Sequence, residues 1–283
     1  YYTPVLGAIF ALEKVFSVTG NTLQDILDRL QHSPTNETDF DENWSQGRAA
    51  FGGLVAAFAS LSMKKMLKPQ PPLRSLMASF IAPLPPAPLS VEAAVQRQGR
   101  NVTQCSATVL SEGRPALQAL GVFGQAREGI RVQAAPLSNP LPRSEGIPFA
   151  KYAARMPTFL NQFEGCWVGD AMPFSGSRSR RLNMWVRHRC DMSDYPAEKI
   201  IAIADMPPPV LLCHYDKPFV PASSVSWGLE FIVDPADVKG EWFYLDFDLD
   251  AAADGYTQQS GRIYEESGRL CALSRQCMAY FEQ

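Results

Sequence analysis

The sequence predicts an α+β protein made of two copies of one unit, in which a buried helix is followed by antiparallel strands. A helix-length segment from Ala49 to Leu67 is apolar on nearly every face until Lys64, which is typical of a helix enclosed by other elements. A hairpin pattern occurs twice, starting at Thr103 and at Thr257. With 283 residues, of which 46% are hydrophobic, the chain has ample apolar content for a core.

The two hairpin segments read TQCSATVLSEGRPAL, from Thr103, and TQQSGRIYEESGRLCAL, from Thr257. Each contains an alternating run, an acidic residue, a Gly-Arg turn and a second apolar run, which together indicate two antiparallel strands. A further strand lies upstream of each hairpin, with Phe80 in one copy and Phe231 in the other, and alternating strands such as WFYLDFDLD from Trp242 complete each unit. The repeated order is therefore a helix and then four strands, and we expect a short strand before the helix.

The second predicted helix is AEKIIAIAD, from Ala197 to Asp205. It ends there because Pro207, Pro208 and Pro209 follow, which lack the N–H group of a helix and clash with the preceding turn. One helix buried by one curved sheet is the hot-dog arrangement. Two such units in one chain predict a double hot dog with the two sheets side by side.

The two units have predicted boundaries. Residues 1–130 form the N-terminal hot-dog domain with an N-terminal extension, and residues 160–283 form the C-terminal hot-dog domain. Residues 131–159 are rich in Pro and Ser and are predicted to be a linker, whose PLSNPLPRSEG core supports no regular element. In the extension, the apolar stretch from Pro4 to Leu12 is too short for a membrane span, so we expect a docked amphipathic helix.

The charge balance excludes several classes of partner. The chain has 26 basic and 29 acidic residues, so its net charge of -3 gives no global basic field that nucleic acid or an anionic membrane would attract. The six cysteines show neither a CxxC pair nor metal-ligand spacing, so we expect reduced thiols in a cytoplasmic protein. No metal and no cofactor are expected, because the sequence has no HExxH and its three histidines lie far apart.

Six short motifs are spaced along the two halves of the chain. The N-terminal half has QGRAAFGG, a strand that ends in FIAP, and GRNVTQ from Gly99. The C-terminal half has Ala204-Asp205 on the second helix, SSVSWGLEF from Ser223, and SRQ from Ser274. By their order and spacing, the chain resembles the double hot-dog acyl-CoA thioesterases of the thioesterase II type across nearly its full length. The resemblance implies hydrolysis of fatty acyl-CoA to a free acid and coenzyme A, in a homodimer or larger homo-oligomer.

The same resemblance implies three catalytic residues. In that family a hydrolytic water is held by an Asp on the second helix, a Thr or Ser on the following strand and a Gln on the last strand. By position these are similar to Asp205, Ser224 and Gln276. The hydroxyl residue is serine here where the best-known members have threonine, which keeps the hydrogen-bonding group. Ser223 and Ser226 lie close by and remain alternatives for the hydroxyl.

The chemistry of these residues fits thioester hydrolysis. Asp205 lies at the carboxyl end of its helix, where the dipole and burial both disfavour an anion, so we expect a carboxylate basic enough for a general base. Glycines at a helix N-terminus leave N–H groups unblocked, so Gly53 is the leading donor to the thioester carbonyl, and Gly52 allows close approach. The first helix has no acidic residue and Gly121 stands opposite Gln276 in the repeat, so we expect one active site per chain.

Two other functions remain open from the sequence alone. The nearest enzymatic alternative is an enoyl-CoA hydratase of the hot-dog superfamily, because GDAMPF from Gly169 faintly resembles that family's motif, although it lacks the histidine. The other alternative is a non-catalytic acyl-CoA-binding protein.

We expect the acyl chain to lie in an apolar tunnel between the halves. Bulky side chains that could limit its depth are those of Phe51, Phe58 and Trp227. The basic clusters Lys64–Lys65 and Arg178–Arg181 could receive the phosphates of coenzyme A, although a charged cluster is more often a solvated face.

Overall fold

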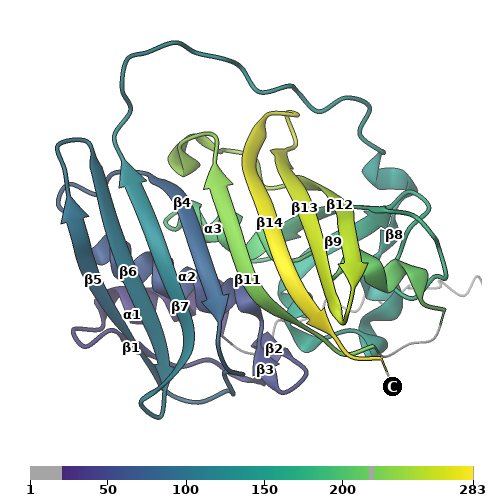
Figure 1. Cartoon of the computed structure of the whole chain (residues 1–283), viewed down its shortest axis with the longest axis horizontal. Coiled ribbons are helices and arrows are strands. Elements are labelled where there is room, and N and C mark those ends of the chain that lie inside the picture. The colour runs from purple at the N-terminus through teal and green to yellow at the C-terminus, as the bar shows by residue number, and fades with distance from the viewer. Residues whose placement is uncertain (1–20, 217–219, 283) are drawn as a thin grey trace, which may run out of the picture.

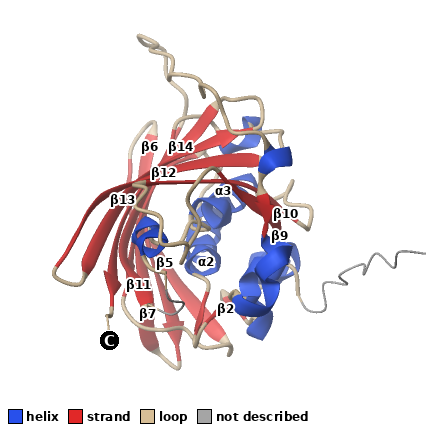
Figure 2. Ribbon diagram, turned by 90° about the vertical axis from the view of Figure 1, so that its right-hand side faces the viewer, coloured by secondary structure: helices blue, strands red, loops and turns tan. Residues whose placement is uncertain are grey.

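The computed structural model describes residues 21–216 and 220–282. Two central helices, α2 (Gly52–Lys65) and α3 (Pro196–Ala204), lie on the concave side of one large curved sheet (Figures 1 and 2). The arrangement confirms the predicted α+β double hot dog. The amphipathic helix predicted for Pro4–Leu12 lies outside the described residues. None of the helices in the described ranges combines the length and the apolar character that a membrane span requires.

The N-terminal half has the predicted order of a helix and then four strands. Before α2 comes α1 (Leu23–His32), which begins at a capping box between Thr22 and Asp25 and buries its apolar face. Short strands also precede α2, as predicted. The remaining elements are β1 (Glu37–Thr38), η1 (Glu42–Trp44), β2 (Ser45–Gln46), β3 (Ala49–Ala50), β4 (Leu73–Phe80), β5 (Leu89–Gln98), β6 (Val102–Ser111) and β7 (Arg114–Gly124).

The C-terminal half also places four strands after its helix, but two longer strands precede α3 where a short one is predicted. The four are β11 (Ala222–Phe231), β12 (Phe243–Ala253), β13 (Tyr256–Glu265) and β14 (Leu270–Tyr280). The elements before them are η2 (Arg143–Glu145), β8 (Ile147–Pro148), η3 (Phe149–Arg155), η4 (Thr158–Gln162), β9 (Phe163–Val168), β10 (Arg181–His188) and η5 (Val210–His214). The 3₁₀ turns η2 and η3 and strand β8 fall in the predicted linker, whose boundaries remain a prediction. The prediction that its PLSNPLPRSEG core has no regular element is wrong at Arg143–Glu145, which form η2.

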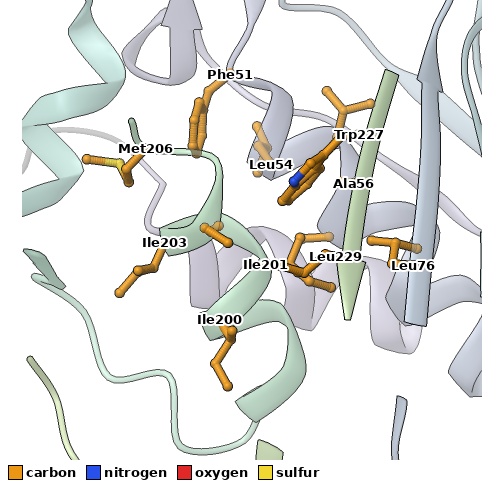
Figure 3. Close-up of a cluster of buried hydrophobic side chains, with 14 of the residues drawn as sticks. Phe51, Leu54, Ala56, Leu76, Ile200, Ile201, Ile203, Met206, Trp227 and Leu229 are labelled. Carbon is orange, nitrogen blue, oxygen red and sulfur yellow. The ribbon is translucent and has the colours of Figure 1, made fainter. Parts of the chain in front are cut away.

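Helix α2 is enclosed as the sequence predicts, because every residue from Gly53 to Met63 is buried. It packs beside α3 in the opposite direction: Gly53 lies against Ala202, and Ser60 Oγ donates a 2.8 Å hydrogen bond to Glu198 Oε1. The antiparallel packing brings the start of α2 to the end of α3. Figure 3 shows the cluster that fills the space between the helices and the sheet, which includes Leu54, Ala56, Leu76, Ile201, Trp227 and Leu229.

The two halves share one sheet. In the described ranges its strand order is β1-β5-β6-β7-β4-β11-β14-β13-β12-β10-β9-β8. The junction is the antiparallel pair β4–β11, whose register runs from Ser226 opposite Ser79 to Glu230 opposite Ser75. Because this pairing continues the sheet from one half into the other, the halves are held in a fixed relation by backbone hydrogen bonds.

Candidate active site

A cavity of about 810 Å³ lies at the start of α2 and the end of α3, beside the first residues of β11 and the last residues of β14. Its polar wall includes Gly52, Asp205, Ser224 and Gln276. Three predicted catalytic residues and one of the two predicted glycines therefore surround one cavity. Its aromatic wall is formed by Phe80, Phe149, Tyr152, Phe159, Trp167 and Phe174.

Asp205 is the residue that caps the C-terminus of α3, and its carboxylate points to the start of α2. Its Oδ1 accepts a 2.6 Å hydrogen bond from Gln276 Nε2, and its carboxylate also accepts one from the backbone N–H of Gly53. Burial raises the pKa of Asp205 to about 7, against the lowering effect of these two hydrogen bonds. The result is a carboxyl group that exchanges its proton near neutral pH and is more basic than an ordinary aspartate.

Gln276 lies on β14, where inward and outward side chains alternate, and faces the core. Directly opposite it on β13 is Gln259, whose Nε2 donates a 2.9 Å hydrogen bond to Gln276 Oε1. Gln259 Oε1 in turn accepts a 2.9 Å hydrogen bond from the backbone N–H of Val210. Sequence reasoning missed Gln259, although the repeat contained a signal: the hairpin of the first half has Cys105 at this position.

Ser224 lies on the cavity side of β11. It stands opposite Met278, which is buried and also lines the cavity, and residues opposite each other in an antiparallel pair share a face. Within the described residues, no hydrogen bond joins Ser224 Oγ to the side chain of Asp205 or Gln276. Ser226, one of the two alternatives, is exposed beyond a β-bulge, and Ser223 is exposed at the cavity rim.

The two glycines of α2 have different surroundings. Gly52 lines the cavity, and a Cβ at this position would lie 2.7 Å from Asp205 Oδ2. Gly53 is buried behind it, its N–H is engaged by Asp205, and a Cβ there would lie 3.0 Å from the Cα of Ala202. The geometry therefore favours Gly52 over Gly53 as the glycine that a ligand in the cavity can approach.

The first half of the chain lacks an equivalent of the acid and amide pair. Gly121, which the repeat aligns with Gln276, is opposite Cys105, and Met63 at the end of α2 packs over it. A Cβ on Gly121 would lie 2.9 Å from Met63 Cε. An apolar thioether thus fills the place that corresponds to the polar centre of the second half.

The aromatic residues predicted to limit the cavity do not line it. Phe51, Phe58 and Trp227 are buried in the core, as Figure 3 shows for Phe51 and Trp227. Three of the six aromatic side chains of the wall, those of Phe149, Tyr152 and Phe159, come from segment 143–162, which includes much of the predicted linker. This segment is held to the first half by Thr158, whose Oγ1 donates to the backbone oxygens of Glu42 and Ser45 at 2.7 and 3.0 Å.

In the basic clusters considered for coenzyme A, three side chains have partners within the protein, those of Lys65, Arg180 and Arg181. Lys65 Nζ donates to the backbone oxygens of Leu30 and Ser33 and to Asn36 Oδ1. In the second cluster, Arg180 donates to the backbone of β12, and Arg181 forms an ion pair with Asp246. These contacts join elements of the fold, so we assign neither cluster to a ligand.

Comparison with known families identifies the chain. Residues 40–124 match the family described as "Acyl-CoA thioesterase N-terminal domain", and residues 133–280 match "Acyl-CoA thioesterase C-terminal domain". The chain belongs to the acyl-CoA thioesterase family. It is a thioester hydrolase, as the resemblance predicts. No curated protein matches the sequence of this thioesterase.

Solved structures share the fold of this thioesterase at low identity. A hot-dog protein of unknown function from Alicyclobacillus acidocaldarius has a TM-score of 0.77 at 20% identity, over 87% of this chain and 93% of that one. The tesB protein of Mycobacterium avium subsp. paratuberculosis has a TM-score of 0.73 at 17% identity, over 92% and 100%. For the acyl-CoA thioesterase II TesB2 of Mycobacterium marinum the values are 0.70 and 16%, over 91% and 98%.

The alternative of a hot-dog hydratase gains no support from the site. Asp170 of the GDAMPF motif is exposed, and none of the three histidines lines the cavity. Among the described residues, moreover, no group of three or more His, Cys, Asp or Glu side chains could hold a metal.

Proposed function

We propose that this thioesterase hydrolyses fatty acyl-CoA with a water molecule that Asp205 activates, and releases a free acid and coenzyme A. The observation that carries the proposal is the 2.6 Å hydrogen bond from Gln276 to the buried Asp205, beside an apolar cavity. The raised pKa of Asp205, about 7, supports the role of general base.

The proposed reaction needs one proton carrier. As the water oxygen bonds to the carbonyl carbon of the thioester, its proton passes to Asp205 and the carbonyl oxygen becomes negative. When the tetrahedral intermediate collapses, the C–S bond breaks and the sulfur of coenzyme A takes the proton from Asp205. The products are a carboxylic acid and a thiol, and Asp205 is again a carboxylate.

Three further groups orient this chemistry in the proposal. Gln276 holds Oδ1 of Asp205, while Ser224, on the same cavity wall, positions the water. The donor to the carbonyl oxygen is the N–H of Gly52, which as the first residue of α2 has no acceptor within the helix. We prefer Gly52 to Gly53 because the N–H of Gly53 already donates to Asp205 and stabilises the base.

The aromatic wall of the cavity is proposed to hold the acyl group, because apolar surface is buried there on binding. The enzyme is further proposed to need no metal or cofactor, since a base, an activated water and an amide donor complete the reaction. All six cysteines are free thiols, which supports a reducing compartment such as the cytoplasm. A homodimer or larger homo-oligomer is proposed from the resemblance, and light scattering on the purified chain tests it.

The test is release of free thiol from short, medium and long acyl-CoA esters. We expect Asp205→Asn to lower kcat by about 10²- to 10⁴-fold, the range of a general base, and Ser224→Ala to lower it by about tenfold. Ser226→Ala is the matched control, because Ser226 is on the same strand but outside the cavity wall, and it should retain full activity. Full activity of Asp205→Asn would refute the proposed base. Hydration of an enoyl-CoA ester without thiol release would instead support the hydratase.

A further inference from the structure

We infer that Gln259 is a positioning residue, which acts on Asp205 by fixing the orientation of the Gln276 amide. The inference rests on the proposed role of Asp205 and adds a residue to its site. It is carried by three hydrogen bonds in series, from Val210 N–H to Gln259, from Gln259 to Gln276 and from Gln276 to Asp205, at 2.9, 2.9 and 2.6 Å.

The direction of this series is determined at its start. A backbone N–H can only donate, so Val210 requires the oxygen of Gln259 to face it. The NH₂ group of Gln259 then faces Gln276 and requires its oxygen. As a result the NH₂ group of Gln276 is the end that faces Asp205. Without Gln259, either end of the Gln276 amide could face the acid.

The residues that form these three hydrogen bonds are also shielded from bulk solvent. Val210 and Gln259 have no exposed surface, and Gln276 is 2% exposed. Neither Val210 nor Gln259 lines the cavity, so turning the Gln259 amide leaves a buried donor or acceptor unpaired. Val210 is itself held in place at the start of η5, directly after the three prolines that end α3.

The internal repeat provides an independent comparison. In the first half, the pair that corresponds to Gln259 and Gln276 is Cys105 and Gly121, which stand opposite each other in the same way. That half has no acid at the end of its helix, and Met63 covers the site. The two amides thus occur together in the half that carries the carboxylate and are both absent from the other, as expected if they serve Asp205.

The orientation of Gln276 decides which form of Asp205 it stabilises. An NH₂ group that donates to Oδ1 favours the carboxylate, whereas an amide oxygen in its place would accept a proton from the neutral acid. The other influences on the pKa of Asp205 are burial and the N–H of Gly53, with no contribution from a charged neighbour among the described residues. Loss of Gln259 should therefore raise the pKa of Asp205 and reduce the fraction of it that is a carboxylate, without touching the substrate.

The experiment compares Gln259→Met with Gln258→Met, its neighbour on β13, which faces the other side of the sheet. We expect Gln259→Met to lower kcat about tenfold with KM within about twofold, and to move the acidic limb of the pH profile to higher pH. In a Gln276→Met background the same substitution should have no further effect, because its target is gone. A purely structural role would give additive losses and an unchanged pH profile, which would overturn the inference.

Gln259→Glu is the second variant, in case Gln259→Met is too unstable to assay. Glutamate keeps the size and accepts from Val210, but as a carboxylate it can only accept from Gln276, which turns the amide oxygen toward Asp205. We expect a folded protein with lower kcat and a shifted acidic limb, and wild-type kinetics would overturn the inference. An inactive wild type, or a fully active Asp205→Asn, would instead refute the proposed function.

Discussion

Asp205 combines two properties that usually oppose each other, burial and charge. A buried carboxylate without partners would remain protonated at neutral pH. The N–H of Gly53 and the NH₂ group of Gln276 each stabilise the anion, and burial still keeps the pKa at about 7. The expected position of Asp205 at a helix C-terminus, where the dipole opposes an anion, is therefore only part of its environment, because the N-terminus of α2 faces it from the other side.

The pH dependence of hydrolysis follows from this pKa. The base must be a carboxylate, so kcat/KM should rise about tenfold per pH unit on the acidic side and level off near pH 7. The measurement is thiol release from one acyl-CoA ester between about pH 5 and pH 9. An acidic limb near pH 4, the ordinary range of an aspartate, would contradict the assignment.

As pH rises, the contribution of Asp205 to the stability of the fold should decrease, whereas the activity should increase. The pKa of Asp205 is about 7 when folded and near 3.8 when unfolded, so between these values the folded state binds the proton that the unfolded state releases. Stability from this group falls as pH rises through that window. Asp205→Asn removes the buried charge and should raise Tm at pH 8 by roughly 3–6 °C, about 1–2 kcal/mol. Below pH 4 the variant and the wild type should melt alike, and scanning calorimetry at both pH values checks this.

The antiparallel packing of α2 against α3 determines how close Gly52 and Asp205 lie to each other. Gly52 and Gly53 allow the start of α2 to approach the end of α3 without a side chain between them. A Cβ at Gly52 would meet only side-chain atoms at the cavity wall, the carboxylate of Asp205 and the ring of Phe80, whereas a Cβ at Gly53 would also meet the backbone of Ala202. The proposed function thus assigns catalysis to Gly52, whereas the surroundings of Gly53 indicate a role in packing.

Alanine substitutions should separate these two roles. Gly52→Ala places a methyl group 2.7 Å from Asp205 Oδ2, so we expect kcat/KM to fall more than about tenfold with a stability change below about 1 kcal/mol. Gly53→Ala crowds the buried Phe51 ring and the Ala202 backbone and should destabilise the protein by about 1–3 kcal/mol. Urea unfolding and thiol release on both variants provide the measurement. Equal effects of the two on both quantities would contradict this division.

Elements with a clear hydrophobic period could be predicted from the sequence, and the cavity wall could not. The run from Ala49 to Leu67 contains α2, and the hairpin signatures become β6–β7 and β13–β14, because their patterns are local. Segment 143–162 has no such pattern: its 3₁₀ turns depend on distant contacts such as Thr158 with Glu42. Gln276 could be named from the family resemblance, whereas Gln259 becomes meaningful only when the strand register places it opposite Gln276.

For the molecule as a whole, the β4–β11 junction and the shared core make the two halves one structural unit. The hydrophobic cluster around α2 and α3 draws side chains from both halves, from Leu23 to Ala272. Neither half could bury its central helix alone, because each helix covers part of the other. The groups that are proposed to act on the substrate also come from both halves, Gly52 from the first and Asp205 from the second.

Unfolding should therefore occur in a single step. We expect urea transitions followed by far-UV circular dichroism and by tryptophan fluorescence to coincide, although only Trp44 of the five tryptophans lies in the first half. Two separated transitions would show that the halves unfold independently, contrary to the shared core.

Segment 143–162, which Thr158 anchors to the first half, is separate in sequence from the residues proposed to carry out hydrolysis. Half of the aromatic wall that is proposed to hold the acyl group comes from segment 143–162, whereas Asp205 caps the end of α3 and Gln259 and Gln276 lie on β13 and β14. Exchange of this segment between relatives could thus alter substrate preference and leave the hydrolytic centre intact. Divergence of specificity in such an enzyme would then proceed by remodelling one stretch of irregular backbone, with the catalytic framework inherited unchanged.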